Sequence, residues 1–181
     1  MLVPSKKPLM DEKEIAVIVD KLGAKIALEM GSDGPITVLG LLRGCFVFTA
    51  DLVRSISRHG GIIQEVDFLI ASSYGSGTTS SGNVKIERDI RFDIAGKNVL
   101  VIDDILDTGN TLNRITEHFQ LRKPKLMKTC VMLDKPSRRE VAFDADYIGK
   151  SIEDFFVVGY GLDYDHKWRE LPYITIMQES D

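Results

Sequence analysis

The chain has 181 residues, of which 44% are hydrophobic and 28% are charged, and its formal net charge is −4. This composition is ordinary for a globular protein and excludes a disordered or fibrous chain. The length suits a single core, so we expect residues 1–181 to form one domain. The negative charge argues against broad nonspecific binding of nucleic acid, which relies on a positive surface.

The cysteines, histidines and apolar runs indicate where in the cell the protein is expected and which metal or disulfide sites it lacks. Cys45 and Cys130 each lie in an apolar run, which is typical of buried, reduced thiols, and the three histidines fit no zinc-binding spacing. The N-terminus lacks the apolar core of a signal peptide, and no apolar run approaches the ~20 residues of a membrane helix. We therefore expect a cytoplasmic protein with no membrane partner.

Apolar periodicity predicts alternating helices and strands. The first predicted helix covers residues 11–30, with Asp11 and Glu14 as its capping residues and Gly31 at its end. In chain order, the prediction continues with a strand at 36–42, a helix at 45–56, strands at 66–71, 84–90 and 98–103, a helix that ends before Pro124, and strands at 126–133, 146–149, 155–160 and 173–177. This alternation predicts an α/β fold with a mainly parallel sheet covered on both faces.

A long polar stretch, SSYGSGTTSSGN at residues 72–83, interrupts this pattern. It contains only serine, glycine, threonine, tyrosine and asparagine, so it has little to bury. Long polar loops in a compact domain are usually functional or disordered, and these residues fit both interpretations.

The stretch VLVIDDILDTGNTL, residues 99–112, runs from an apolar strand directly into three aspartates. Ligands of open parallel sheets bind beyond the carboxyl ends of the strands, where the N-termini of the following helices point. After Asp107, free amides and the hydroxyls of Thr108 and Thr111 form a cradle suited to a phosphate monoester. Gly109 allows the backbone to approach the anion closely.

Two further carboxylates precede this cradle. Asp103 and Asp104 would repel a bare phosphate, so we expect them to bind sugar hydroxyls or Mg²⁺. A ribose 5-phosphate satisfies both parts of the pattern. The DTG triplet alone is also found in aspartic proteases, but these need two such aspartates, and only one DTG occurs here. A response-regulator site lacks a candidate for its phosphorylated aspartate, and a purely structural loop is the remaining alternative.

These residues resemble a known family. VLVIDDILDTGNT resembles the ribose-phosphate fingerprint of the type I phosphoribosyltransferases, with an apolar run, two acids, two apolar residues and then DTGNT. Four other stretches resemble the hypoxanthine–guanine subfamily in the correct order, namely LLRGCFVFTADL, SSYGSGTTSSGNVKI, LDKPSRREV and FFVVGYGLDYDHKWREL. The resemblance covers nearly the whole chain and implies the type I fold, with a small hood formed by the terminal segments.

The resemblance also implies an activity and the residues that perform it. The expected reaction transfers 5-phosphoribosyl from phosphoribosyl pyrophosphate to hypoxanthine or guanine, with Mg²⁺ as the cofactor. Phosphate would bind to Asp107, Thr108, Gly109, Asn110 and Thr111, and pyrophosphate to Arg43, Gly44, Ser73, Tyr74 and Arg169. Lys135, Phe156, Val157 and Asp163 would form the base site, and Asp103, Asp104 and Asp163 would hold the metal. Asp107 is the expected proton acceptor.

Other implications and alternatives remain open at this point. The resemblance implies a cis peptide at Leu42–Arg43, although a plain strand-to-helix turn would also explain Gly44. Arg138 and Arg139 are expected to be solvated surface residues. Alternative functions are a xanthine-preferring relative, an RNA-binding, uracil-sensing regulator of the same fold and a scaffold protein that has lost catalysis. By analogy we expect a homodimer or homotetramer.

Overall fold

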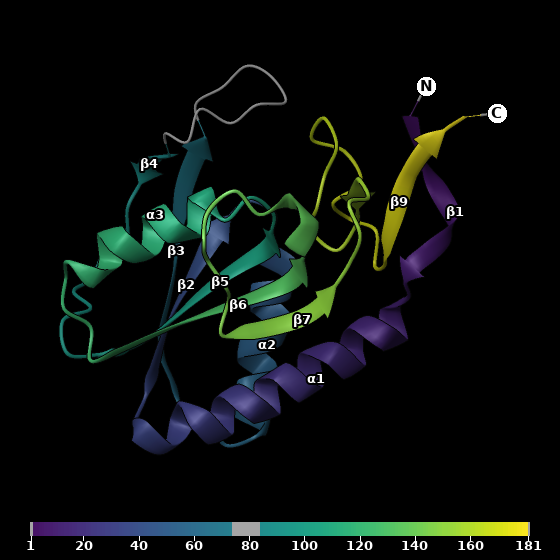
Figure 1. Ribbon diagram of the computed structural model, residues 1–181. Helices are drawn as coiled ribbons and strands as arrows, with labels where there is room; N and C mark the ends of the chain where they lie inside the picture. The colour runs from purple at the N-terminus through teal and green to yellow at the C-terminus, as the bar shows by residue number, and fades with distance from the viewer. Residues whose placement is uncertain (1, 74–83, 181) are drawn as a thin grey trace.

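A computed structural model describes residues 2–73 and 84–180 of the chain. Its main feature is a six-stranded sheet in the order β4-β3-β2-β5-β6-β7 (Figure 1). The strands in chain order are β2 (Ile36–Leu42), β3 (Ile63–Ser73), β4 (Val84–Arg88), β5 (Asn98–Leu106), β6 (Leu126–Asp134) and β7 (Tyr147–Ser151). All are parallel except the edge strand β4, which pairs antiparallel with β3. The predicted mainly parallel sheet is therefore confirmed.

Helices cover both faces of this sheet. On one face lie α1 (Glu12–Glu29) and α2 (Phe46–Arg58), and on the other lies α3 (Asn110–Gln120) (Figure 1). Residues 99–102 of β5 are all apolar because both faces of the strand are buried. Leu100 and Ile102 lie in the core under α1 and α2, and Val99 and Val101 lie in the core under α3. The predicted capping box of α1 is present.

A second, three-stranded sheet forms the hood, in the order β1-β9-β8. It consists of β1 (Leu2–Met10), β8 (Val157–Val158) and β9 (Ile174–Glu179), and β1 and β9 lie side by side near the two chain ends (Figure 1). Apolar periodicity did not predict a strand at residues 2–10, although the family resemblance implied a hood of terminal segments, as the structure has. The segment contains Pro4 and Pro8, which an edge strand tolerates, and it is a strand because β9 pairs with it.

Strand β5 is three residues longer than predicted, and this changes the position of the acids. Pairing with β6 continues as far as Leu106 and Asp134, so Asp104, like Asp103, belongs to the strand rather than following it. Cys45 and Cys130 are buried free thiols, as expected. Within the described part of the chain, no helix has the length and apolar character needed to cross a membrane.

Candidate functional site

Two neighbouring carboxylates near the carboxyl end of β5 begin the site. Successive side chains of a strand face opposite ways, so Asp103 and Asp104 point in different directions. The Asp104 amide donates a hydrogen bond of 2.9 Å to Oδ1 of Asp103. The Asp104 carboxylate occupies the space above Gly44, because a Cβ added to that glycine would lie 1.5 Å from Oδ2 of Asp104. A glycine at position 44 thus makes room for this carboxylate.

The two acids lack a neutralising partner. Burial, followed by the charge of Asp104, raises the pKa of Asp103 well above its ordinary value. Burial likewise raises the pKa of Asp104, and the hydrogen bonds from Asp103 and the backbone, together with the smaller effect of the Arg169 charge, oppose this only in part. Among the residues that the structure describes, neither carboxylate takes part in an ion pair. A cation bound here would therefore stabilise the ionised pair.

The predicted phosphate cradle lies between β5 and α3. Gly109 caps α3 in the left-handed conformation, with φ of 86°, and its carbonyl accepts a 2.9 Å hydrogen bond from the amide of Asn113. The Asn110 amide is 3.3 Å from the hydroxyl oxygen of Thr108. A Cβ on Gly109 would lie 2.9 Å from Cγ2 of Val141, so packing as well as conformation requires glycine. The first-turn amides of a helix have no acceptor within the helix, which makes the start of α3 suited to an anion.

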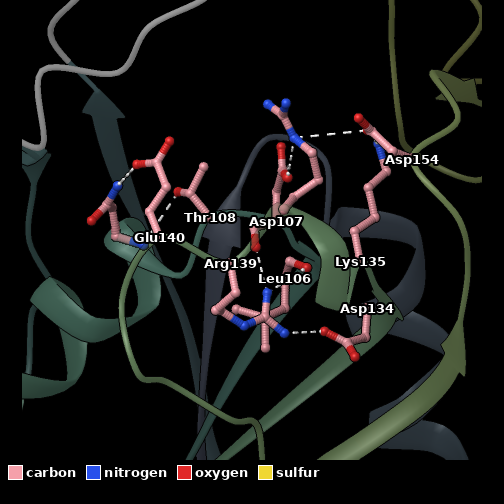
Figure 2. A network of polar contacts seen from close by, with 10 residues as sticks. Leu106, Asp107, Thr108, Asp134, Lys135, Arg139, Glu140 and Asp154 are labelled. Carbon is pink, nitrogen blue, oxygen red and sulfur yellow. Dashed lines mark hydrogen bonds and ion pairs between the residues drawn. The ribbon is translucent and has the colours of Figure 1, made fainter.

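Arg139 braces the backbone before the cradle (Figure 2). Its guanidinium donates to the carbonyl oxygens of Leu106, at 3.2 Å, and Asp107, and it pairs with the buried carboxylate of Asp134. The Arg139 side chain is only 15% exposed. The prediction that Arg139 is a solvated surface residue was therefore wrong, because the side chain packs between the buried Asp134 and the backbone of residues 106 and 107, which lie more than 30 positions earlier.

Arg138 connects the cradle to the predicted base site. Its Nε lies 3.1 Å from Oδ1 of Asp107 and 3.7 Å from Oδ1 of Asp154. The same oxygen of Asp154 is 3.5 Å from Nζ of Lys135, whose side chain is almost completely buried (Figure 2). Arg138 is exposed, as predicted for a surface residue, and it also has ionic partners on both sides.

Two loops meet above Asp104. The Arg169 guanidinium donates to the carbonyl of Gly161 at 2.7 Å and pairs with Oδ1 of Asp163, also at 2.7 Å. Gly161 adopts a positive φ of 100°, and a Cβ there would lie 2.1 Å from the carbonyl oxygen of Gly44. The loop that carries Asp163 and Arg169 is therefore packed directly on the loop after β2.

The remaining predicted residues lie around these loops. The peptide bond Leu42–Arg43 is cis, as expected, and Arg43 is exposed. Phe156 is 51% exposed and its ring contacts that of Tyr164 edge-on, at 5.4 Å between centroids, while Val157 is buried in β8. Ser73 is the last residue of β3, and Tyr74 lies outside the described residues.

Comparison with known proteins places this arrangement in a family. Residues 6–165 match the family model described as a phosphoribosyl transferase domain. The chain belongs to the phosphoribosyl transferase family. It is 48% identical over 167 residues to the hypoxanthine phosphoribosyltransferase of Escherichia coli (strain K12), covering 92% of each chain. It is 45% identical to the hypoxanthine-guanine phosphoribosyltransferase of Aquifex aeolicus, covering 96% of this chain and 95% of that one.

Solved structures agree with the sequence comparison. The hypoxanthine phosphoribosyl transferase of Trypanosoma cruzi superposes with a TM-score of 0.91 at 39% identity, covering 97% of this chain and 92% of that one. These similarities confirm the predicted family and the type I phosphoribosyltransferase fold.

The donor set of this phosphoribosyltransferase fits a magnesium ion held jointly with substrate. Within residues 2–73 and 84–180, no three histidine, cysteine, aspartate or glutamate side chains lie close enough together to hold a metal ion. Asp163 therefore does not form one cluster with Asp103 and Asp104. Mg²⁺ is usually held by one or two carboxylates with substrate phosphates and water, and the unpaired acids of β5 suit that arrangement.

Proposed function

We propose that this chain is a purine-salvage enzyme that transfers the 5-phosphoribosyl group from phosphoribosyl pyrophosphate to hypoxanthine, guanine or both. The products are the nucleotide and pyrophosphate. The observation that carries the proposal is the continuous segment from Asp103 to Thr111, which places two acids beside a helix N-terminus in a chain of this family. The hypoxanthine and hypoxanthine-guanine specificity of the relatives supports this choice of base.

The cradle and the acids have separate tasks in this proposal. The amides of residues 108–111 and the hydroxyls of Thr108 and Thr111 bind the 5-phosphate at the positive end of α3. Asp103 and Asp104 accept hydrogen bonds from the ribose hydroxyls and place the anomeric carbon. Mg²⁺, when bound, would neutralise charge on the departing pyrophosphate. Asp103 and Asp104 are its proposed ligands on β5, and Asp163, which is not clustered with them, is proposed as a separate metal contact.

Lys135, Phe156 and Val157 are the proposed residues of the base site. The Lys135 ammonium has only donors, so it favours a 6-oxo group over a 6-amino group. The exposed ring of Phe156 offers a stacking surface, and Val157 offers backbone groups in β8. Asp163 lies beside the base site in this proposal, although in the structure its carboxylate pairs with Arg169.

Asp107 is the proposed general base. As purine nitrogen N9 forms its bond to the ribose carbon, the bond from that carbon to pyrophosphate breaks, and the proton on N7 passes to the Asp107 carboxylate. The transition state carries positive charge on the ribose, which Asp103 and Asp104 stabilise. Arg43, Gly44, Ser73, Tyr74 and Arg169 are the proposed pyrophosphate site, where the planar guanidinium of an arginine suits phosphate oxygens.

We also propose a cytoplasmic homodimer or homotetramer. In the similar protein from Trypanosoma cruzi, the C-terminal region has a role in the oligomeric state and the enzymatic activity. Sedimentation of the purified chain would test the assembly.

One assay tests the activity directly. The purified chain is incubated with phosphoribosyl pyrophosphate, Mg²⁺ and hypoxanthine, guanine, xanthine or adenine in turn, and nucleotides are separated by chromatography. We expect nucleotide from hypoxanthine or guanine, and none when Mg²⁺ is removed with a chelator. Preferred use of xanthine, or no product from any purine, would contradict the proposal. Filter binding with uridine-rich RNA at physiological salt tests the regulator alternative.

A further inference from the structure

Tyr160 makes a hydrogen bond that the proposed reaction does not use. It is 6% exposed and has a positive φ of 53° at the start of the loop that carries Asp163 and Arg169. Its hydroxyl donates to Oδ2 of Asp51 in α2 at 2.7 Å, and the other oxygen of Asp51 pairs with Arg54. Burial, together with the hydrogen bond to this carboxylate, raises the pKa of Tyr160, so the phenol remains a donor at neutral pH.

The backbone beside this side chain connects it to Arg169. The Tyr160 amide donates to the carbonyl of Leu171 at 2.8 Å, and the Gly161 amide donates to the carbonyl of Arg169 at 3.0 Å. The Arg169 guanidinium in turn donates to the carbonyl of Gly161 at 2.7 Å. Tyr160 thus belongs to the short closed unit that determines where the guanidinium lies.

The hydrogen bond between Tyr160 and Asp51 lies beside a cavity. The cavity has a volume of about 860 Å³, and Asp51, Arg54, Tyr160 and Arg169 are among its lining residues. Leu171 and Pro172 also line this cavity, whereas the side chains of Tyr160 and Leu162 belong to the buried core under α1 and α2. The charge-assisted bond between Tyr160 and Asp51 is a direct tie from this side of the loop to the rigid helix α2.

We propose that Tyr160, held by Asp51, is a positioning residue that places Arg169 for binding the pyrophosphate group. The inference rests on the proposed function, because it takes Arg169 as a pyrophosphate ligand. It extends that proposal by assigning a role to a contact between α2 and the loop, remote from the purine site. The effect should appear in the binding of phosphoribosyl pyrophosphate and of free pyrophosphate, and not in the binding of the purine.

The test compares Tyr160→Phe with Tyr173→Phe. Both variants lose one phenolic hydroxyl, and the Tyr173 hydroxyl makes no hydrogen bond with any residue that the structure describes. For Tyr160→Phe we expect KM values for phosphoribosyl pyrophosphate and, in the reverse reaction, for pyrophosphate to rise about three- to tenfold. The KM for hypoxanthine and kcat should stay within about twofold of the values for Tyr173→Phe.

Further variants separate the possible failures. Asp51→Asn keeps an acceptor oxygen but loses the charge, so its effect should be smaller than that of Tyr160→Phe, and the double variant should resemble the more affected single variant. A Tyr160→Phe enzyme with unchanged KM for both pyrophosphate compounds overturns the inference, as does an equal rise in the KM for hypoxanthine. If Arg169→Gln also leaves these KM values unchanged, the proposed pyrophosphate role of Arg169 itself is wrong.

Discussion

Replacing Gly44 with alanine would test whether the Asp104 carboxylate must lie where the structure places it. An added Cβ would lie 1.5 Å from Oδ2 and 2.5 Å from Cγ of Asp104, but 3.4 Å from the Cβ of Asp104. The carboxylate must therefore rotate away, whereas the backbone of β5 has no need to move. Gly44 does not have a positive φ, so alanine introduces no backbone strain of its own.

These distances predict a small loss of stability and a large loss of activity. Forcing a side chain from its preferred rotamer costs about 0.5–1.5 kcal/mol. For a chain of this length, that corresponds to a decrease in Tm of about 1–6 °C. A catalytic group displaced by an ångström or more reduces the rate about 10²-fold. We therefore expect kcat/KM to fall about a hundredfold in a protein that remains folded at the assay temperature.

The assay follows nucleotide formation from hypoxanthine, and thermal unfolding is measured by circular dichroism. Gly31→Ala is the matched control, because a Cβ there has only an ordinary contact of 3.5 Å with Gly61. In an Asp104→Ala background, Gly44→Ala should have little further effect on kcat/KM, since the clash is gone. The reasoning would be refuted if Gly44→Ala alone kept kcat/KM within about threefold of the unsubstituted enzyme.

Three other substitutions give independent predictions. Asp107→Asn should lower kcat about 10²- to 10⁴-fold with nucleotide binding largely intact, and near-normal kcat in a folded variant would remove Asp107 from the role of general base. Lys135→Ala should reduce the preference for 6-oxo over 6-amino purines, measured as a ratio of kcat/KM values, and an unchanged ratio would contradict its proposed selectivity. The pKa of Asp89 is lowered, because the hydrogen bond from His118 and the charge of Arg122 outweigh the opposing effect of burial. The ionised form of Asp89 therefore stabilises the fold above pH ~4. Asp89→Asn should therefore lower the free energy of unfolding by about 0.5–1 kcal/mol at pH 7. In thermal melts, the difference between the two proteins should vanish as the pH falls through the lowered pKa of Asp89. A difference that persists at the lowest pH would exclude this ion pair as its source.

Local patterns predicted the central sheet and its helices because local residues decide them. Asp11 and Glu14 form the capping box of α1, and the stripe of Leu112, Ile115 and Phe119 is the buried face of α3. Both features depend on side chains three or four positions apart. The family fingerprint was equally local, since residues 103–111 are one continuous strand end, turn and helix start.

Tertiary structure decided the features whose partners are distant in sequence. Strand β1 exists through its pairing with β9, more than 160 residues away, and no periodicity of its own indicated it. Arg139 donates to the carbonyl oxygens of Leu106 and Asp107, more than 30 positions earlier in the chain, and β5 is long because β6 continues to pair with it. The tie between Asp51 and Tyr160 spans 109 positions.

Sequence alone thus predicted the family, which the comparisons confirmed, and it located the strand end, turn and helix start of the proposed phosphate cradle. The structure determined which groups face one another around them, including Arg138 against Asp107, Gly161 against Gly44 and Asp104 above Gly44. The physical reason is the separation along the chain between the groups that interact. Capping, helical periodicity and turn conformation act over a few bonds of the chain, whereas burial and ion pairing depend on which distant segments the completed fold brings into contact.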